Sequence, residues 1–199
     1  MSASLCSTDV LFQQRFLKAA GLYPGCLDGI WGPVTDRATS AFAAAGEELA
    51  CSLGRFDTRS EALIATLQLC AQRAARAFLA RARASGIDAR IISATRTYEE
   101  QNRLFRQGRY GNPGCKVTNA RGGQSNHNFA IAWDIGIFSA GTYLRGLSAY
   151  ENAARACLID DLVWGGAWQT FRDTPHYQLA NGLSTAQTRA LFEAGQRYF

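Results

Sequence analysis

The first fifty residues show the spacing of two amphipathic helices joined by a turn. Apolar side chains recur at helical intervals over residues 8–20, which predicts a first helix. A stretch rich in glycine, proline and aspartate follows, and Pro33 suits the first turn of a second helix, which we expect to end at Gly46. We therefore predict a small helical unit over residues 1–48. We also predict a linker over residues 46–58, which overlaps the end of that unit.

The rest of the chain alternates between helical and strand patterns. Apolar spacing and capping signals predict helices at about 60–84, 97–107 and 149–159 and from Ser184 onward, and strands at 87–93, 129–138 and 176–179. The segment 108–125 is polar and rich in glycine and asparagine, so we expect a loop there. Helices that flank a few non-sequential strands predict an α+β fold class, with a larger domain over residues 59–199 on a short mixed or antiparallel sheet.

The composition excludes two classes of protein. With 47% hydrophobic and 19% charged residues, the chain can bury a core and differs from disordered proteins. No window approaches 18 consecutive apolar residues, so we expect no transmembrane anchor. The first residues lack a basic segment followed by an apolar one, so we expect no signal peptide and synthesis in the cytoplasm.

The charge is unevenly distributed along the chain. The net charge is +5, yet residues 1–50 carry three basic and five acidic side chains, whereas the remainder carries 18 basic and 11 acidic ones. A basic domain favours an anionic partner such as nucleic acid, a lipid surface or a bacterial envelope. Because no motif that reads nucleic acid accompanies the charge, we do not expect nucleic acid to be the partner.

The six cysteines do not form a metal-binding or redox motif. They are scattered, with no CxxC pair, at Cys6, Cys26, Cys51, Cys70, Cys115 and Cys157. An even number permits disulfides, but synthesis in a reducing cytosol would leave thiols. We therefore expect most of them to be buried thiols.

The chain contains only two histidines, and each has an aspartate close by in the sequence. His127 ends a glycine-rich loop, Asp134 interrupts an apolar strand, and Asp173 lies three residues before His176. Two histidines and one carboxylate, with a fourth position left to water, are a ligand set of catalytic zinc sites. The alternative is a structural pairing of each buried histidine with an aspartate, which would need no metal.

These residues resemble the zinc D-Ala-D-Ala peptidase family. The stretches Ser125-x-His127-x(6)-Asp134 and Asp173-x-x-His176 are similar to its SxHxxGxAxD and [DE]xxH signatures. Ser93-Ala-Thr-Arg96-Thr with Gln101 is similar to its upstream SGxR[ST]…Q element. Two positions depart from the pattern. Ala130 stands where the family usually has glycine, which we expect to be tolerated if its φ is negative, and Ala167 stands where aspartate is frequent.

The resemblance is strongest to the phage endolysin branch of this family, which cuts L-alanyl-D-glutamate bonds. The stretch from Val163 to Gln178 is similar to its WGGDW…DxPHFQ block. The resemblance implies that His127, Asp134 and His176 bind one Zn²⁺, that Asp173 is the general base and that Arg96 stabilises the oxyanion. It also suggests substrate or supporting roles for Ser125, Gln101, Trp164 and Trp168.

Each of these roles has a plainer alternative. Arg96 could form a surface ion pair with Glu99 or Glu100, and Ser125 could be an ordinary loop residue rather than one that orients a metal ligand. Trp164 and Trp168 could pack in the core instead of lining a cleft.

The N-terminal unit resembles the three-helix peptidoglycan-binding module. Its loop contains the DGxxGPxT core of that module, which suggests that Asp28, Gly29, Trp31 and Gly32 contribute to wall binding. The alternative is an ordinary turn that joins two helices.

Together, the two resemblances imply a monomeric zinc endopeptidase that binds bacterial peptidoglycan and cleaves its stem peptide at the L-alanyl-D-glutamate bond. An endolysin made in the host cytoplasm and released to the wall would fit this expectation. A D-Ala-D-Ala carboxypeptidase of the same family and a wall-binding protein without catalysis are the alternatives.

Overall fold

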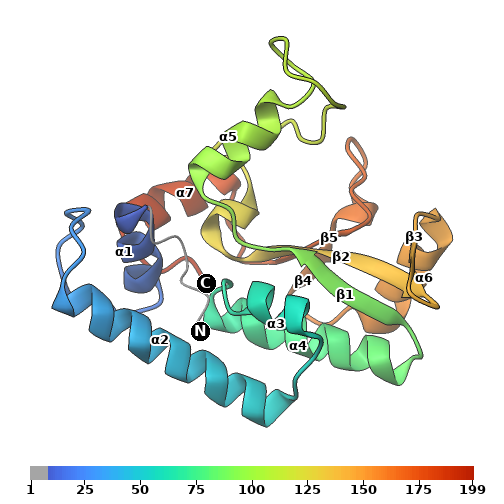
Figure 1. The fold of residues 1–199 in the computed structure, drawn as a ribbon, viewed down its shortest axis with the longest axis horizontal. Helices are drawn as coiled ribbons and strands as arrows, with labels where there is room; N and C mark the ends of the chain where they lie inside the picture. The colour runs from blue at the N-terminus through green and yellow to red at the C-terminus, as the bar shows by residue number, and fades with distance from the viewer. Residues whose placement is uncertain (1–8) are drawn as a thin grey trace.

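An antiparallel sheet with helices packed around it forms the centre of the molecule (Figure 1). The computed structural model describes residues 9–199, so Cys6 lies outside the described residues. The helices are α1 (Val10–Ala19), α2 (Pro33–Leu53), α3 (Thr58–Ile64), α4 (Leu69–Ala84), α5 (Tyr98–Arg106), α6 (Leu147–Cys157) and α7 (Thr185–Glu193). The strands are β1 (Asp88–Ser93), β2 (Ala132–Ser139), β3 (Thr142–Leu144), β4 (Leu162–Trp164) and β5 (His176–Leu179). The predicted α+β class is confirmed.

The order of the strands is β1-β2-β5-β4, and β3 pairs with β2. All four pairings are antiparallel. A register irregularity between Ile91 and Ser93 brings Ser93 opposite Asp134, and on the other side of β2 Asp134 faces His176. One row across three strands therefore contains the Ser93, Asp134 and His176 positions.

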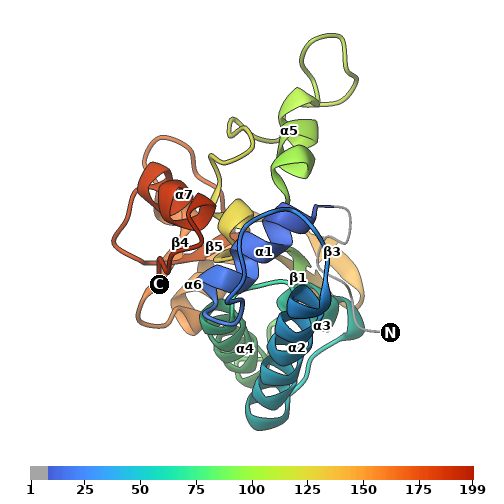
Figure 2. The same cartoon turned by 90° about the vertical axis from the view of Figure 1, so that its left-hand side faces the viewer.

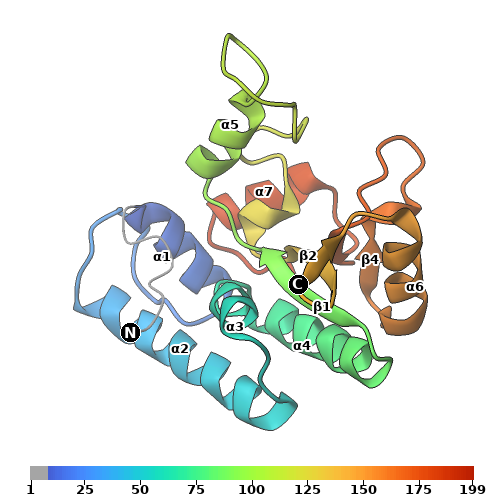
Figure 3. The same cartoon turned by 45° about the vertical axis from the view of Figure 1, so that its right-hand side comes forward.

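One face of the sheet is packed against α4 and α6. Trp133, Ile135 and Ile137 alternate along β2 toward this face, and they join Phe78 of α4 and Tyr177 of β5 in one buried cluster. Because successive strand residues point to opposite faces, Asp134 and His176 point to the other side. There the loop after α5 and the loop before β5 project from the sheet, as Figures 1 and 3 show.

A second buried cluster joins the N-terminal helices to the C-terminal end of the chain. Phe12 and Phe16 of α1 pack with Phe129, Phe192 and Tyr198. Figure 2 shows α1 between α2 and α7, in agreement with this packing. The first helix is therefore part of a core that also supports the segment next to His127.

The helix predicted over 60–84 is instead two helices, α3 and α4. The chain turns at residues 65–68, where the Gln68 N–H donates to the Ala130 carbonyl and its side chain donates to the Phe16 carbonyl. The Thr66 hydroxyl donates to the Leu63 carbonyl. The two bonds of Gln68 are tertiary and the Thr66 bond is local, and in this turn they take the place of helical bonds. Leu67, within the turn, is fully buried.

The second helix does not end at Gly46. It continues to Leu53, and Gly54, with φ +92°, follows its end. Residues 46–53 of the predicted linker are thus helical, and the proposed boundary at residue 48 falls inside α2. The division into two domains stays a prediction.

The expectation that most cysteines are buried is wrong for the described residues. All five are free thiols, but only Cys157 is buried, whereas Cys26, Cys51 and Cys115 are exposed and Cys70 is half-buried. Burial raises the pKa of the Cys70 thiol to about 11. Within residues 9–199 no helix is both long and apolar enough to cross a membrane.

Candidate metal centre

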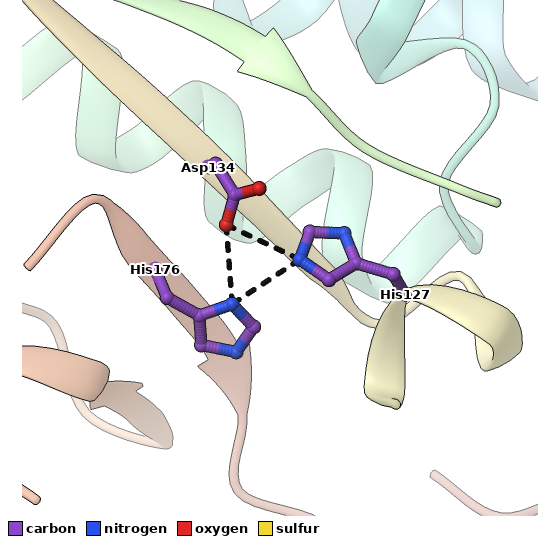
Figure 4. Close-up of side chains that lie close together, drawn as sticks. All are labelled: His127, Asp134 and His176. Atoms are coloured by element: carbon purple, nitrogen blue, oxygen red, sulfur yellow. Dashed lines mark hydrogen bonds and ion pairs between the residues drawn. The ribbon is translucent and has the colours of Figure 1, made fainter. Parts of the chain in front are cut away.

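Three side chains from three elements converge above the sheet (Figure 4). His127 lies in the short 3-10 helix η1 (Asn126–Phe129), Asp134 in β2 and His176 in β5. His127 Nε2, Asp134 Oδ1 and His176 Nδ1 form a triangle in which each of the three distances is 3.2 Å. The structure therefore brings together the three predicted ligands, two of which are fixed by the register of adjacent strands.

The outer nitrogen of each imidazole is already bonded. His127 Nδ1 lies 2.7 Å from the Ala94 carbonyl oxygen, which can only accept, so this nitrogen has the proton. His176 Nε2 lies 3.0 Å from Gln178 Oε1, which accepts in the same way. The two nitrogens that face Asp134 consequently present lone pairs.

With both imidazoles neutral, three hydrogen-bond acceptors thus meet at 3.2 Å without a donor between them. Such an arrangement is repulsive unless a cation lies at its centre. Tetrahedral ligands at zinc distances of ~2.0–2.2 Å would lie about 3.3–3.6 Å from one another, close to the spacing seen here. Two neutral imidazoles with outer hydrogen bonds and one carboxylate therefore fit a zinc ion in both chemistry and spacing.

The electrostatics of the cluster favour an ionised carboxylate. Burial acts to raise the pKa of Asp134, but the adjacent imidazoles of His127 and His176 and the charge of Arg96 outweigh it and hold the pKa well below its usual range. Burial lowers the pKa of His127. For His176 burial acts in the same direction, but the adjacent carboxylate of Asp134 outweighs it and raises the pKa, so the inward-facing side of this imidazole attracts a cation, either a proton or a metal ion.

Arg96 is paired with the second oxygen of Asp134. Its Nη2 donates to Asp134 Oδ2 at 2.6 Å and to Ser93 Oγ at 2.7 Å, and its Nη1 donates to Gln101 Oε1 at 3.3 Å. The alternative of a surface ion pair with Glu99 or Glu100 is therefore wrong. Of these predicted residues, Arg96 pairs directly with a candidate ligand, whereas the fully buried Gln101 contacts Arg96.

The metal centre opens into a cavity of about 820 Å³ between the two projecting loops. Arg96, Ser125, Trp168 and Asp173 all line it, together with the three ligands. Asp173 is outside the ligand cluster, and burial, followed by the charge of Asp134, raises the pKa of its carboxyl group. Asp173 therefore offers a carboxyl group to the cavity in addition to the three candidate ligands.

The two tryptophans differ in position. The Trp168 ring packs against His176 with centroids 5.1 Å apart and lines the cavity. Trp164 is not a lining residue; its indole N–H donates to the Thr174 carbonyl at 2.8 Å and holds the loop before β5. For Trp164, the alternative that the side chain packs in the core instead of lining a cleft fits the structure.

Gly165 allows this loop to approach closely. A Cβ atom there would lie 2.6 Å from the Asp173 carbonyl oxygen and 3.0 Å from His176 Cβ. The Asp173 N–H donates to the Gly165 carbonyl, so the backbone of Asp173 is held against the residue that follows β4. Glycine is therefore needed for the placement of Asp173.

Ser125 and Ala130 flank the metal-binding segment. Within residues 9–199 the Ser125 hydroxyl has no hydrogen bond to a metal ligand, and the residue precedes η1 as its N-terminal cap without a side-chain bond. Ala130 has φ +57° and ψ +30°, so the condition of a negative φ is not met. The position that usually has glycine retains the left-handed backbone in this chain.

Two supporting residues were missed by the sequence analysis. Gln178 is two residues after His176 on β5, so strand alternation places both on one face, and this signal could have identified it. Asn128 is fully buried; its Nδ2 donates to the Arg96 carbonyl and its Oδ1 accepts from the Gly123 N–H. It ties the glycine-rich loop to the segment of Arg96.

The predicted wall-binding residues build a separate loop between α1 and α2. Asp28 Oδ1 accepts from Gln14 Nε2 at 2.7 Å, and the Gly29 N–H, at φ +70°, donates to Gln14 Oε1 at 2.8 Å. The Trp31 indole donates to Asp36, and Gly32 precedes α2 in an extended conformation. These four residues do not line the metal cavity.

Comparisons with known proteins agree with this geometry. A peptidase family of class M15, described as D-alanyl-D-alanine carboxypeptidase, matches residues 118–179, which contain all three candidate ligands and Asp173. The chain is 33% identical over 104 residues to the peptidoglycan L-alanyl-D-glutamate endopeptidase CwlK of Bacillus subtilis. That alignment covers 47% of this chain and 62% of the relative, so the chain spans less than two thirds of the relative's length.

A solved structure, the L-Ala D-Glu endopeptidase ChiX of Serratia marcescens, is similar at 27% identity with a TM-score of 0.47. The match covers 63% of this chain and 89% of that chain.

Proposed function

We propose that the chain is a zinc peptidase that cleaves peptidoglycan stem peptides between L-alanine and D-glutamate. The observation that carries the proposal is the convergence of His127 Nε2, Asp134 Oδ1 and His176 Nδ1 at 3.2 Å from one another, in a large cavity that Asp173 also lines. The similarity to the endopeptidase CwlK supports the choice of bond.

His127, Asp134 and His176 would bind the metal. When bound, zinc supplies a Lewis acid that polarises the scissile carbonyl and favours deprotonation of water. The Ala94 carbonyl and Gln178 hold the two imidazoles with their lone pairs facing inward. Arg96 occupies Asp134 Oδ2, so that Oδ1 faces the histidines.

Asp173 would act as the general base. Its carboxylate takes a proton from the attacking water and passes it to the leaving amine. Arg96 lines the same cavity, and we propose that its guanidinium also stabilises the charge that develops on the carbonyl oxygen. Trp168 and the loop residues of the cavity would position the peptide.

Product analysis tests this function. Zinc-loaded chain is incubated with purified peptidoglycan and with defined muropeptides, and the products are identified by mass spectrometry. The expected products are peptides with a new amino group on D-glutamate. Absence of any cleavage while the chain still pulls down with peptidoglycan would replace the proposal by a wall-binding protein without catalysis.

A D-Ala-D-Ala carboxypeptidase is the second candidate, because the matching family has that description. It would use the same metal centre and base, and it would release free D-alanine from muropeptides. The same mass spectra distinguish the two activities.

We further propose that the loop of Asp28 and Trp31 binds the wall and that the chain acts as a monomeric endolysin. The exposed Ile30 and Trp31 at this loop support wall contact. Sedimentation with peptidoglycan, before and after Trp31→Ala, tests the binding. The chain is produced inside bacterial cells, and the turbidity of the cell suspension is followed. Clearing of the suspension only after the inner membrane has been permeabilised would support action from the cytoplasm.

A further inference from the structure

The positive excess of the chain lies in one projecting segment, residues 101–124, which we call the cationic arm. It contains the later part of α5 and the loop that follows this helix. None of the 16 acidic side chains lies in the arm, but five of the 21 basic ones do: Arg103, Arg106, Arg109, Lys116 and Arg121. The other 16 basic side chains equal the acidic ones in number. Figures 1 and 2 show that the arm stands away from the rest of the fold.

The five cations of the arm have no counter-charge within residues 9–199. None of them forms an ion pair there. Four are exposed, and Arg109 is half-buried. The nearest acidic residues along the chain, Glu99 and Glu100, stand in the first turn of α5, where Glu100 accepts from the Thr97 N–H and caps the helix. Cations placed together in this way repel one another, and an anionic partner would relieve the repulsion.

The arm is held in shape by its own contacts. Arg109 Nη1 donates to the carbonyls of Phe105 and Thr118, so it joins the helix to the returning side of the loop. The guanidinium of Arg109 lies 4.3 Å from the centre of the Phe105 ring, and that of Arg121 lies 4.9 Å from the same centre. Because these groups are already positioned, they lose little conformational freedom when they bind an anion.

The cations lie beside the metal cavity but do not line it. The arm residues that line the cavity are all uncharged. In α5 these are Leu104 and Gln107, and each directly follows a cation, Arg103 or Arg106. The charged surface therefore borders the opening through which a substrate enters. A polymer that places one of its units in the cavity would bring neighbouring units to the arm.

We propose that the cationic arm binds the acidic stem peptides that neighbour the one being cleaved. A stem peptide has free carboxylates on D-glutamate and at its C-terminal end. Four of the five cations are guanidinium groups, which bind a carboxylate through two parallel hydrogen bonds. The choice of stem peptides as the anion rests on the proposed function, whereas the presence of the cationic surface does not.

Sedimentation with purified peptidoglycan measures this binding without cleavage. The probe is peptidoglycan freed of membrane and of phosphate polymers, so that carboxylates are its anionic groups. Every chain used is the zinc-loaded full chain with Asp173→Asn, which we expect to leave the probe intact. Every chain also has Trp31→Ala, because we propose that the loop of Trp31 binds the wall independently. This double variant is the reference chain.

Two further triple substitutions separate the arm from total charge. The arm variant changes three exposed side chains that form no ion pair: Arg103→Gln, Arg106→Gln and Lys116→Gln. The control removes the same charge from exposed positions outside the arm: Arg37→Gln, Arg73→Gln and Arg145→Gln. At low salt we expect the arm variant to bind about tenfold more weakly than the control. The difference should disappear at 1 M salt, where the screening length is ~3 Å.

Amidation of the peptidoglycan identifies the anion. Conversion of its carboxylates to amides leaves the glycan in place, and it should weaken binding of the reference chain much more than binding of the arm variant. Equal binding of the arm variant and the control, or unchanged binding of the reference chain after amidation, overturns the proposal. Stronger binding to phosphatidylglycerol vesicles than to peptidoglycan also overturns it, since the arm would then be a lipid-binding surface.

The same measurements distinguish failure of this proposal from failure of the proposed function. If the arm variant and amidation weaken binding as expected, but the chain that retains Asp173 releases no peptides, the arm binds stem peptides and the proposed cleavage is wrong. If the chain cleaves peptidoglycan, but the arm variant binds as well as the control, the proposed function stands and the role of the arm is wrong.

Discussion

Asp134 and His176 lie directly opposite each other on the adjacent antiparallel strands β2 and β5, with Asp134 Oδ1 and His176 Nδ1 3.2 Å apart. Strand pairing therefore holds two of the three candidate ligands, and only His127 depends on a loop and a short 3-10 helix. Because sheet positions are rigid, the orientation of the imidazoles is decided by their outer hydrogen bonds.

Gln178 should set the metal affinity through His176. Gln178→Leu removes the acceptor of His176 Nε2, so the imidazole loses its fixed tautomer, and we expect zinc to bind about 10–100-fold more weakly. Competition with a chelator measures the affinity. Gln178→Glu, which keeps an acceptor, should restore most of it; equal affinity of the leucine variant and wild type would show that this hydrogen bond is unimportant.

Substitutions of Asp173 and of His127 should distinguish a loss of catalysis from a loss of metal binding. Asp173→Asn removes the base but no ligand, so zinc content should stay at one per chain while cleavage falls by about 10²–10⁴-fold. His127→Ala should lose both zinc and cleavage. Metal analysis and product release are measured on the same samples. Loss of zinc in Asp173→Asn would instead make Asp173 a ligand and bring Asp134 into question.

Much of the site could be predicted from local sequence signals. The capping box of Thr97 and Glu100 begins α5 as expected, and Asp134 stands out as a carboxylate in an apolar strand. Both signals act within a few residues, where chain geometry fixes which atoms meet.

The remaining features depend on contacts between distant residues. The break between α3 and α4 follows from the bond of Gln68 to Ala130, and the continuation of α2 through Gly46 goes with its contact to Gln72. The partner of Arg96 is 38 residues away across the sheet rather than on the next turn of helix. Sequence spacing contains no signal for such pairs.

The ion pair of the buried Arg76 with the partly buried Glu61 should make stability depend on acid pH. Burial acts to raise the pKa of Glu61, but the hydrogen bonds from Arg76 and from the Phe56 N–H outweigh it and lower the pKa below 4.5. The contribution of Glu61 to the free energy of unfolding is therefore fully present above pH 4.5, and it is lost as the pH falls through the lower pKa of the folded state. Glu61→Gln leaves Arg76 without its counter-charge and should cost about 2–4 kcal/mol at pH 7.

Urea unfolding at several pH values measures this effect. Between pH 7 and about pH 3.5, wild type should lose more stability than Glu61→Gln, so that the two curves converge. Glu47→Gln, in an exposed pair with Arg55, is the control and should change stability far less than Glu61→Gln does. Parallel curves for wild type and Glu61→Gln would contradict the assignment.

Ala130 should tolerate glycine unusually well for a fully buried alanine. Its left-handed backbone costs about 1–2 kcal/mol for a residue with a Cβ, and glycine would relieve this cost. Against it stand the lost methyl burial of ~0.8 kcal/mol and the greater freedom of glycine in the unfolded chain, ~0.4–1 kcal/mol. The terms nearly cancel, so Ala130→Gly should lie within about 1 kcal/mol of wild type.

Ala75→Gly is the control. It lies at an equally buried position in the middle of α4 and should cost about 2 kcal/mol, because helix propensity and methyl burial act together. Urea unfolding of both variants decides the matter: if Ala130→Gly loses as much stability as Ala75→Gly, the backbone at position 130 is not strained.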